Sequence, residues 1–254
     1  MSNNNSVNND HGFIGTGTPY FYPDDGSPVF FFGNPIACKI STSSDEKVRT
    51  SRRKGDAGSS LDSRTTPKPA QVTISTDTFQ PKTWAMAMMG TAGKVTVAVQ
   101  TIADEAAVAV LDGYHQLAHA DIDATTFIVK KGATPIDASA YELIPSMGLL
   151  QITDETAAAA NEALTVSYST KLVTKTVIEG AKVTSFRGKV VVDGKNDVTG
   201  DDAKLTIHNV SLAVNGDFDW FSDDYNAIEM VGTASVGKNG ESPYSVDLYD
   251  PTIV

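Results

Sequence analysis

The chain has a single cysteine in 254 residues, Cys38, which excludes an intramolecular disulfide and any zinc site built from several cysteines. Long apolar runs are missing as well, since none approaches the roughly 18 residues that a membrane-spanning helix needs. Residues 1–10 are polar and Asn-rich, without a basic segment followed by an apolar one, so no secretory signal is expected.

Basic residues are scarce: 20 Lys and Arg stand against 31 Asp and Glu, which gives a net charge of −11. Proteins that hold nucleic acid tightly need a basic footprint, and anionic membrane surfaces also attract basic proteins. Both classes are therefore disfavoured. The hydrophobic and charged fractions, 41% and 20%, are those of an ordinary globular protein, long enough for one large domain or two small ones.

Catalytic motifs are absent too: there is no GxSxG, no phosphate-cradling glycine loop and no CxxC. His115 and His119 have the i, i+4 spacing of a helical metal site, but Gln116 stands where the metalloprotease pattern has its Glu. The acidic stretch 193–202 lacks the ligand order of an EF-hand, which leaves weak calcium binding as a minor alternative. The sequence predicts no enzyme, no cofactor and no metal site, and favours surface or interface histidines and solvated acidic turns.

The basic residues that are present gather in one segment, 45–69, where apolar residues nearly vanish among Ser, Thr and Gly. Such a segment cannot bury an apolar face, so we expect a long exposed loop or arm, a basic island on an acidic protein. Four of the five arginines lie in it. Its candidate contacts to another subunit are Arg49, Arg52, Arg53, Lys54, Arg64 and Lys68.

The remainder of the chain has the pattern of short strands. Aromatic residues between Phe13 and Phe32 predict extended pieces broken by a turn at 23–26. Residues 71–79 alternate as a strand does, whereas 82–89, rich in Ala and Met and followed by Gly90, predict a short helix. Further strands are expected at 126–130, 141–144, 149–153, 163–169, 174–178, 183–192, 204–214 and 227–236, with an acidic turn at 196–202. Residues 106–117 fit a helix and a strand equally.

No single motif in this chain identifies a protein family, but the order of all these features together does indicate one. It runs from Phe32-Gly33-Asn34-Pro35 through the basic arm, the strand QVTIST and the helix WAMAMMG. The stretches YELIPSMGLLQI, ALTVSYS, Phe186-Arg187-Gly188-Lys189 and NAIEMVGTASV follow. From about Gly12 to Tyr244 this order resembles the major tail tube protein family of long-tailed bacteriophages.

The resemblance implies a mainly β fold of two packed antiparallel sheets, as a sandwich or barrel, with a short flanking helix. A flexible tail, residues 1–12, would precede a tail tube domain made of 13–104 and 171–254. Residues 105–170 resemble the small β-rich insertion that some members carry on the outside of the tube.

The resemblance also implies that six subunits form a ring and that the rings stack into a hollow tube, with the arm at 45–69 reaching a neighbouring ring. The tube would surround the tape measure protein and later conduct genomic DNA. Further partners would be the tail terminator and distal tail proteins, with no membrane partner. The expected location is the virion tail, assembled in the host cytoplasm.

Elementary electrostatics agrees with these expectations. A lumen that attracted phosphates would retain DNA, so an acidic protein suits a conduit. The basic arm would meet carboxylates of the next subunit, and contacts of this heterologous kind generate rings and stacked filaments. If the ring closes its inner sheets into one barrel, inward positions should be polar; the candidates are the alternate polar positions of 71–79 and 189–193.

The alternative is a host- or glycan-binding β-sandwich module of a virion. Aromatic residues at 20–22 and at Trp220-Phe221 would then form a sugar platform, although such residues also serve as core or interface residues. For the arm, the alternatives are a disordered loop and a nucleic-acid contact, the latter disfavoured because no aromatic residues are interleaved with its cations.

Overall fold

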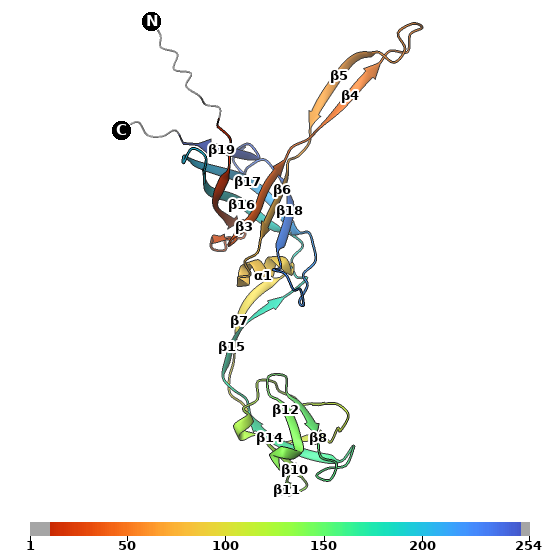
Figure 1. Cartoon of the computed structure of the whole chain (residues 1–254), viewed down its shortest axis with the longest axis vertical. Coiled ribbons are helices and arrows are strands. Elements are labelled where there is room, and N and C mark those ends of the chain that lie inside the picture. The colour runs from red at the N-terminus through yellow and green to blue at the C-terminus, as the bar shows by residue number, and fades with distance from the viewer. Residues whose placement is uncertain (1–10, 250–254) are drawn as a thin grey trace, which may run out of the picture. The chain divides into compact units, whose positions relative to one another are not determined.

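The structure, a computed structural model, describes residues 11–249. The predicted fold class is confirmed, because the described residues are mainly β, in antiparallel sheets, with one short α-helix (Figure 1). The chain divides into two compact units: unit 1 comprises the chain up to Ala92 and from Ile178, and unit 2 comprises Gly93–Val177. No helix among the described residues has the length and apolar character needed to cross a bilayer.

Unit 1 is built on an eight-stranded antiparallel sheet in the order β2-β1-β16-β17-β18-β6-β3, with β19 paired to β17 next to β18. The strands are β1 (Gly15–Pro23), β2 (Phe30–Phe31), β3 (Pro35–Ser41), β6 (Gln71–Thr76), β16 (Phe186–Asn196), β17 (Asp202–Val214), β18 (Ile228–Ala234) and β19 (Tyr244–Leu248). The predicted turns are present, at residues 24–26 after β1 and at 197–201 between β16 and β17.

The core of unit 1 contains side chains from both ends of the strand order, so the sheet bends around it. Phe21 of β1 and Val190 of β16 belong to the same buried cluster as Ile74 of β6 and Met230 of β18. The sheet ends in β2 on one side and β3 on the other, and neither β2 nor its neighbour β1 is hydrogen-bonded to β3, so the barrel does not close. Alternation of apolar and polar residues along each strand explains which face is buried.

The predicted short helix is confirmed as α1 (Pro81–Ala87). It begins where Pro81 sets the first helical turn and where the Thr83 hydroxyl accepts the backbone N–H of Gln80 at 2.7 Å. Met86 on its inner face joins the core. The chain leaves the helix at Gly90, where a Cβ would overlap the carbonyl oxygen of Glu179, so only glycine fits this close approach.

Unit 2 is a small sandwich of two antiparallel sheets that share one core, in which Val129 and Leu164 of one sheet pack with Leu150 and Ile152 of the other. The first sheet contains β8 (Thr101–Val108), β10 (Ile128–Lys131), β11 (Thr134–Pro135) and β14 (Ala163–Ser169). The second contains β9 (His115–Gln116), β12 (Tyr141–Ile144) and β13 (Leu149–Ile152), and short 3-10 turns η1 (Ala124–Thr126) and η2 (Ala138–Ala140) precede β10 and β12.

The ribbon of β7 (Thr91–Val97) and β15 (Val173–Glu179) carries the chain into and out of unit 2. Unit 2 therefore contains the expected insertion 105–170 together with flanking residues on both sides. The ambiguous segment 106–117 contains no helix: it is a strand up to Val108, where β8 pairs with β14 and turns Ala107 into the core, and again at His115–Gln116 in β9. Residues 1–10 of the expected flexible tail lie outside the described residues.

The expected exposed loop or arm at 45–69 is a β-hairpin, whose strands the sequence pattern did not predict. Strands β4 (Ser44–Thr50) and β5 (Ser60–Pro67) pair antiparallel over nearly their whole length. Their residues alternate without an apolar face, so the pairing depends on backbone hydrogen bonds and not on a buried side.

The core of unit 1 should be sensitive to the loss of a single leucine side chain. Leu212 is fully buried, so Leu212→Ala should lower the free energy of unfolding of unit 1 by about 2–5 kcal/mol. Both tryptophans lie in unit 1, so urea denaturation followed by tryptophan fluorescence reports that unit. Leu248→Ala, at a side chain 72% exposed, is the matched control and should stay within about 0.5 kcal/mol of wild type. An unchanged midpoint for Leu212→Ala would contradict the described core.

Candidate functional site

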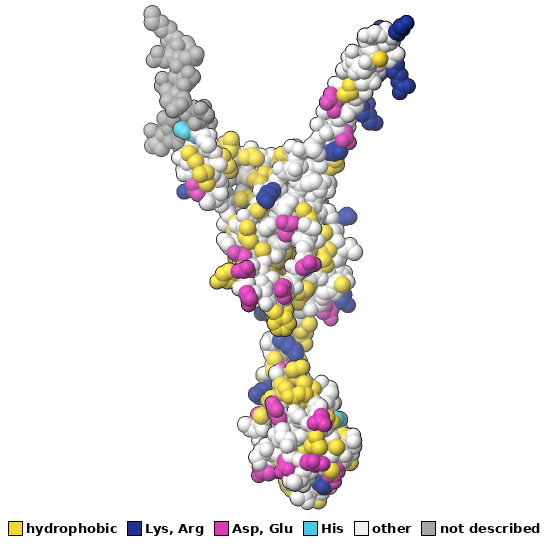
Figure 2. Space-filling model, turned by 45° about the vertical axis from the view of Figure 1, so that its right-hand side comes forward, with side chains coloured by type: hydrophobic (Ala, Val, Ile, Leu, Met, Phe, Trp, Pro, Cys, Tyr) yellow, Lys and Arg dark blue, Asp and Glu magenta, His cyan; other side chains and the backbone are white. Residues whose placement is uncertain are grey.

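The β4–β5 hairpin exposes every residue of both strands to solvent. Figure 2 shows Lys and Arg side chains gathered along it. Its register places Lys47 directly opposite Arg64, and like charges opposite each other in a ribbon are destabilising. An anionic group from outside the hairpin would remove this repulsion.

Two of the six predicted contact residues are already paired within the hairpin. The Arg49 guanidinium lies 2.7 Å from the Asp62 carboxylate across the two strands, and Lys68 Nζ lies 2.6 Å from Asp45. Both pairs are exposed, so each contributes at most about 1 kcal/mol to stability. Arg49 and Lys68 are therefore paired within the hairpin of a single copy, and their contact with another subunit stays a prediction.

The other four predicted residues have no carboxylate within ion-pair distance among residues 11–249. Three of them follow one another at the tip, and the fourth faces Lys47 on the shaft. They are Arg52, Arg53, Lys54 and Arg64.

The tip of the hairpin, residues 51–59, is an ordered turn. Ser51 is buried, its N–H donates to the carbonyl of Ser59 at 2.7 Å, and its own carbonyl accepts the N–H of Gly58 at 2.9 Å. Gly55 and Gly58 both have positive φ, which a side chain would strain. The three tip cations are therefore presented on a defined loop.

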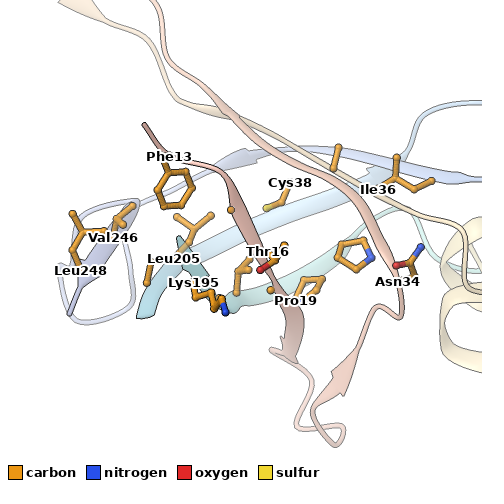
Figure 3. A pocket seen from close by; sticks show the side chains of 17 residues that line it. Phe13, Thr16, Pro19, Asn34, Ile36, Cys38, Lys195, Leu205, Val246 and Leu248 are labelled. Atoms are coloured by element: carbon orange, nitrogen blue, oxygen red, sulfur yellow. The ribbon is translucent and has the colours of Figure 1, made fainter. Parts of the chain in front are cut away.

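A second surface is an apolar groove of about 740 Å³ in unit 1, between the unpaired ends of the bent sheet (Figure 3). Val192 and Leu205 lie at its base, from β16 and β17. Its rim carries four strongly exposed apolar side chains, a high density for a monomer surface. These are Phe13, Ile36, Val246 and Leu248.

Three free strand edges border this groove among the described residues. β3 pairs only with β6, and β19 only with β17. β1 pairs with β2 only at Tyr20 and Phe21, so its first residues have a strand partner on the β16 side alone. Exposed edges of this kind are templates for pairing with another chain.

The histidine pair with i, i+4 spacing lies in a short strand of unit 2 and the irregular segment after it, and not on a helix. His115 lies in β9, and His119 packs its ring edge-on against Tyr168. No group of three His, Cys, Asp or Glu residues suited to a metal occurs within residues 11–249. Asp123 and Asp137 accept hydrogen bonds from the hydroxyl and amide two residues later, which lowers the pKa of each carboxyl and shapes a turn.

The predicted lumen positions alternate with the core as expected. Along β6, Val72 and Ile74 point into the core, while Gln71 and Thr73 lie on the opposite face. In the second candidate stretch Lys189 is half-buried and Asp193 is exposed. The lumen assignment itself stays a prediction.

The aromatic residues proposed as a sugar platform differ in exposure. Phe21 is buried in the core, so 20–22 is not an exposed platform, and this corrects the expectation for that site. Tyr22 is instead covered in part by Lys189, whose Nζ lies 4.5 Å from the ring centre. Trp220 and Phe221 are strongly exposed, 73% and 89%.

Comparison with protein families gives a match over residues 13–240 to the family described as "Protein of unknown function UCP028589". The chain belongs to this family. The matched range includes the basic hairpin and all of unit 2 and ends before β19, so family membership covers most of both surfaces described above. A search of curated proteins gave no significant match.

The groove also contains the single thiol of this family member. Burial raises the pKa of Cys38 to about 11, because the protein interior disfavours the charged thiolate. The thiol is therefore protonated at neutral pH and has little nucleophilic character. Its place in the groove is that of a small apolar side chain.

Cys38 should accordingly react slowly with alkylating reagents. At pH 8 a thiol of pKa about 11 is ionised roughly once in a thousand molecules, against about a quarter for a free cysteine. We expect iodoacetamide to modify native Cys38 at least about 100-fold more slowly than glutathione, with the rate rising about tenfold per pH unit until pH approaches 11. Mass spectrometry of timed samples measures this, and the guanidinium-unfolded chain is the control. A native rate equal to the unfolded one would contradict the assigned environment.

Proposed function

We propose that this protein is a structural virion subunit that assembles as stacked hexameric rings into the hollow tail tube of a long-tailed bacteriophage. In that role it surrounds the tape measure protein, later conducts genomic DNA, and meets the tail terminator and distal tail proteins at the tube's ends. It has no catalytic role in this proposal.

The observation that carries the proposal is the basic hairpin. It projects from the sheet of unit 1 with no layer on either face, and three cations at its tip lack partners among the described residues. Residues 45–69 hold seven basic and four acidic residues, a net charge of +3. Since the whole chain has a net charge of −11, the residues outside this segment have a net charge of −14. A basic projection on an acidic body is complementary to the body of another copy.

The open edges of the unit 1 sheet support lateral association in the same proposal. A neighbouring copy that pairs with β3 or covers the groove would satisfy unpaired backbone groups and bury the rim of apolar side chains together. In a ring of six copies an edge of one copy meets a different edge of the next, and such heterologous contacts close when the rotation permits.

The charge of the body supports the conduit role. A tube whose wall carries net negative charge repels phosphates, so DNA passes without the salt-dependent affinity that basic contacts create. The basic residues that would otherwise attract DNA are concentrated on the hairpin, where the proposal assigns them to contacts between subunits.

One observation favours the second candidate, a glycan-binding module. Trp220, Phe221 and Tyr225 are all strongly exposed in one loop, and exposed aromatic rings are also the usual platform for sugars. Glycan-array binding by a non-assembling protein would favour this candidate over the tube.

Shortening the hairpin should abolish stacking and leave the fold intact. Asp45 and Thr66 are cross-strand partners, so residues 46–65 can be replaced by an Asn-Gly turn without disturbing the base. Negative-stain electron microscopy of the concentrated full-length protein should show rings and hollow filaments, and the shortened variant should show none of the long filaments.

The matched control replaces the cations Arg52, Arg53 and Lys54 by Ser in the full-length hairpin, which separates the loss of charge from the loss of length. Unchanged urea denaturation of the shortened variant shows that the sheet of unit 1 is preserved. Long filaments formed by the shortened variant would contradict the proposed role of the hairpin in stacking.

The groove should be required for lateral contacts. Ile36 is the extra residue of a bulge in β3 and is 55% exposed, so Ile36→Lys should leave stability within about 0.5 kcal/mol but place a charge in any apolar interface. We expect sedimentation velocity to show loss of ring-sized species. Val99→Lys, at a side chain 57% exposed in unit 2, is the control and should sediment as wild type. Ring formation by Ile36→Lys equal to that of wild type would exclude the groove.

A further inference from the structure

The loop between β17 and β18, residues 215–227, exposes three large aromatic side chains that the proposed function has not used. Phe221 is 89% and Tyr225 99% exposed, and Trp220 is 73% exposed. Side chains of this size in one short loop form an apolar patch that solvent does not favour, and patches of this kind mark interaction surfaces.

This loop is anchored on α1 through Phe218 and Trp220. Phe218 and Trp220 pack against Trp84 of α1 with ring centres 4.8 and 6.2 Å away, and Phe218 also contacts Phe79 at 5.6 Å. The Asp219 carboxylate accepts the N–H of Phe221 at 2.9 Å. The half of the loop that packs on α1 thus presents the other half to solvent.

The same loop carries four carboxylates and no basic residue. None of them forms an ion pair with any lysine, arginine or histidine among residues 11–249. The carboxylates alone indicate only a solvated turn, but together with the exposed rings they form a surface that fits a cationic, partly apolar partner. They are Asp217, Asp219, Asp223 and Asp224.

The partner of matching chemistry within this chain is the hairpin tip, and the topology keeps the two apart in one copy. β6 begins at Gln71, next to the base of the hairpin, and ends at Thr76, which pairs with Ile228 directly after the acidic loop. The base of the hairpin and the acidic loop therefore lie at opposite ends of β6, about 20 Å of strand apart, and the tip lies a further hairpin length away, as Figure 1 shows for the hairpin and α1. A positive projection at one end and a negative patch at the other predispose copies to join head to tail.

We propose that the hairpin tip of one copy, Arg52–Lys54, docks on the acidic aromatic loop of the next copy. The guanidinium groups stack on Phe221 and Tyr225, while Asp223 and Asp224 supply the opposite charges. The proposal rests on the assembly proposed above and adds to it the surface that receives the hairpin.

A second copy is favoured over a glycan or a nucleic acid as the occupant. Four unpaired carboxylates repel the phosphates of nucleic acid and are complementary to the tip's three adjacent cations. A glycan would use the rings but gives no role to the carboxylates or to the tip.

A charge exchange between the two surfaces tests the docking. The tip variant, Arg52→Glu with Arg53→Glu, makes both surfaces negative. The loop variant replaces Asp217, Asp223 and Asp224 by Lys and makes both surfaces positive. Each variant alone should lose filaments at low salt, because tip and loop now repel. An equimolar mixture of the two should regain them, since each tip then meets a loop of opposite charge.

The controls carry the same changes in net charge elsewhere. They are Lys94→Glu with Lys171→Glu for the tip, and Asp112→Lys, Glu142→Lys and Glu155→Lys together for the loop. Both should form filaments as wild type does. Electron microscopy and sedimentation velocity at 25 mM and 500 mM salt measure all of these samples.

The outcomes separate this proposal from the one it rests on. If wild type forms no rings or filaments, the tube itself is wrong. If wild type assembles and the mixture fails to regain filaments, or if the loop variant assembles alone, the hairpin does not dock on this loop. Tip-dependent retention of DNA by wild type, with filaments unaffected by the tip variant, would also overturn the docking.

The aromatic part of the contact has its own test. Phe221→Ala and Tyr225→Ala should each raise the protein concentration needed for filaments about five- to tenfold through the lost cation–π contact. Tyr114→Ala, at a tyrosine 45% exposed in unit 2, is the control and should leave it unchanged. An equal effect of all three variants would contradict the stacking.

Discussion

A two-stranded ribbon has no interior, and this constraint governs the β4–β5 hairpin. Isolated hairpins are at best marginally stable in water, because two strands bury too little apolar surface to offset their loss of conformational entropy. Here the ribbon gains support from its ordered tip and from the Arg49–Asp62 and Lys68–Asp45 pairs. It nevertheless holds Lys47 opposite Arg64 and three adjacent cations at its end. In the proposed assembly, carboxylates of another copy meet those charges.

The body of unit 1 imposes a related constraint. Its sheet bends far enough to enclose a core, with Phe32 and Leu212 fully buried, but its ends do not hydrogen-bond and leave an apolar groove between them. A core of this size stabilises one copy, while the open edges remain available to others. Charge at the hairpin and apolar surface at the groove thus suit two directions of association, along a filament and around a ring.

Much of the fold could be predicted from the sequence, because apolar alternation reports burial directly. Residues 71–76 and 141–144 form strands for this reason, and the short helix ends before Gly90 as expected. The hairpin strands could not be predicted, since SDEKVRT and SLDSRTTP have no apolar period and pair through the backbone. The sequence showed that basic residues gather in 45–69, but not which residues of the two hairpin strands face each other. Only the structure shows that Arg49 faces Asp62, and the acidic aromatic loop lacked any signal that its rings stay exposed.

The most direct test of intermolecular contact by the hairpin is zero-length cross-linking in a mixture of ¹⁵N-labelled and unlabelled protein. A carbodiimide joins a lysine to a carboxylate only when the two are in contact, and the isotopes show whether both come from one chain. The account predicts cross-linked peptides from Lys54 to carboxylates of the 215–227 loop that contain one labelled and one unlabelled partner. If Lys54 forms cross-links only within single chains, or none at concentrations where filaments are present, the central claim is contradicted.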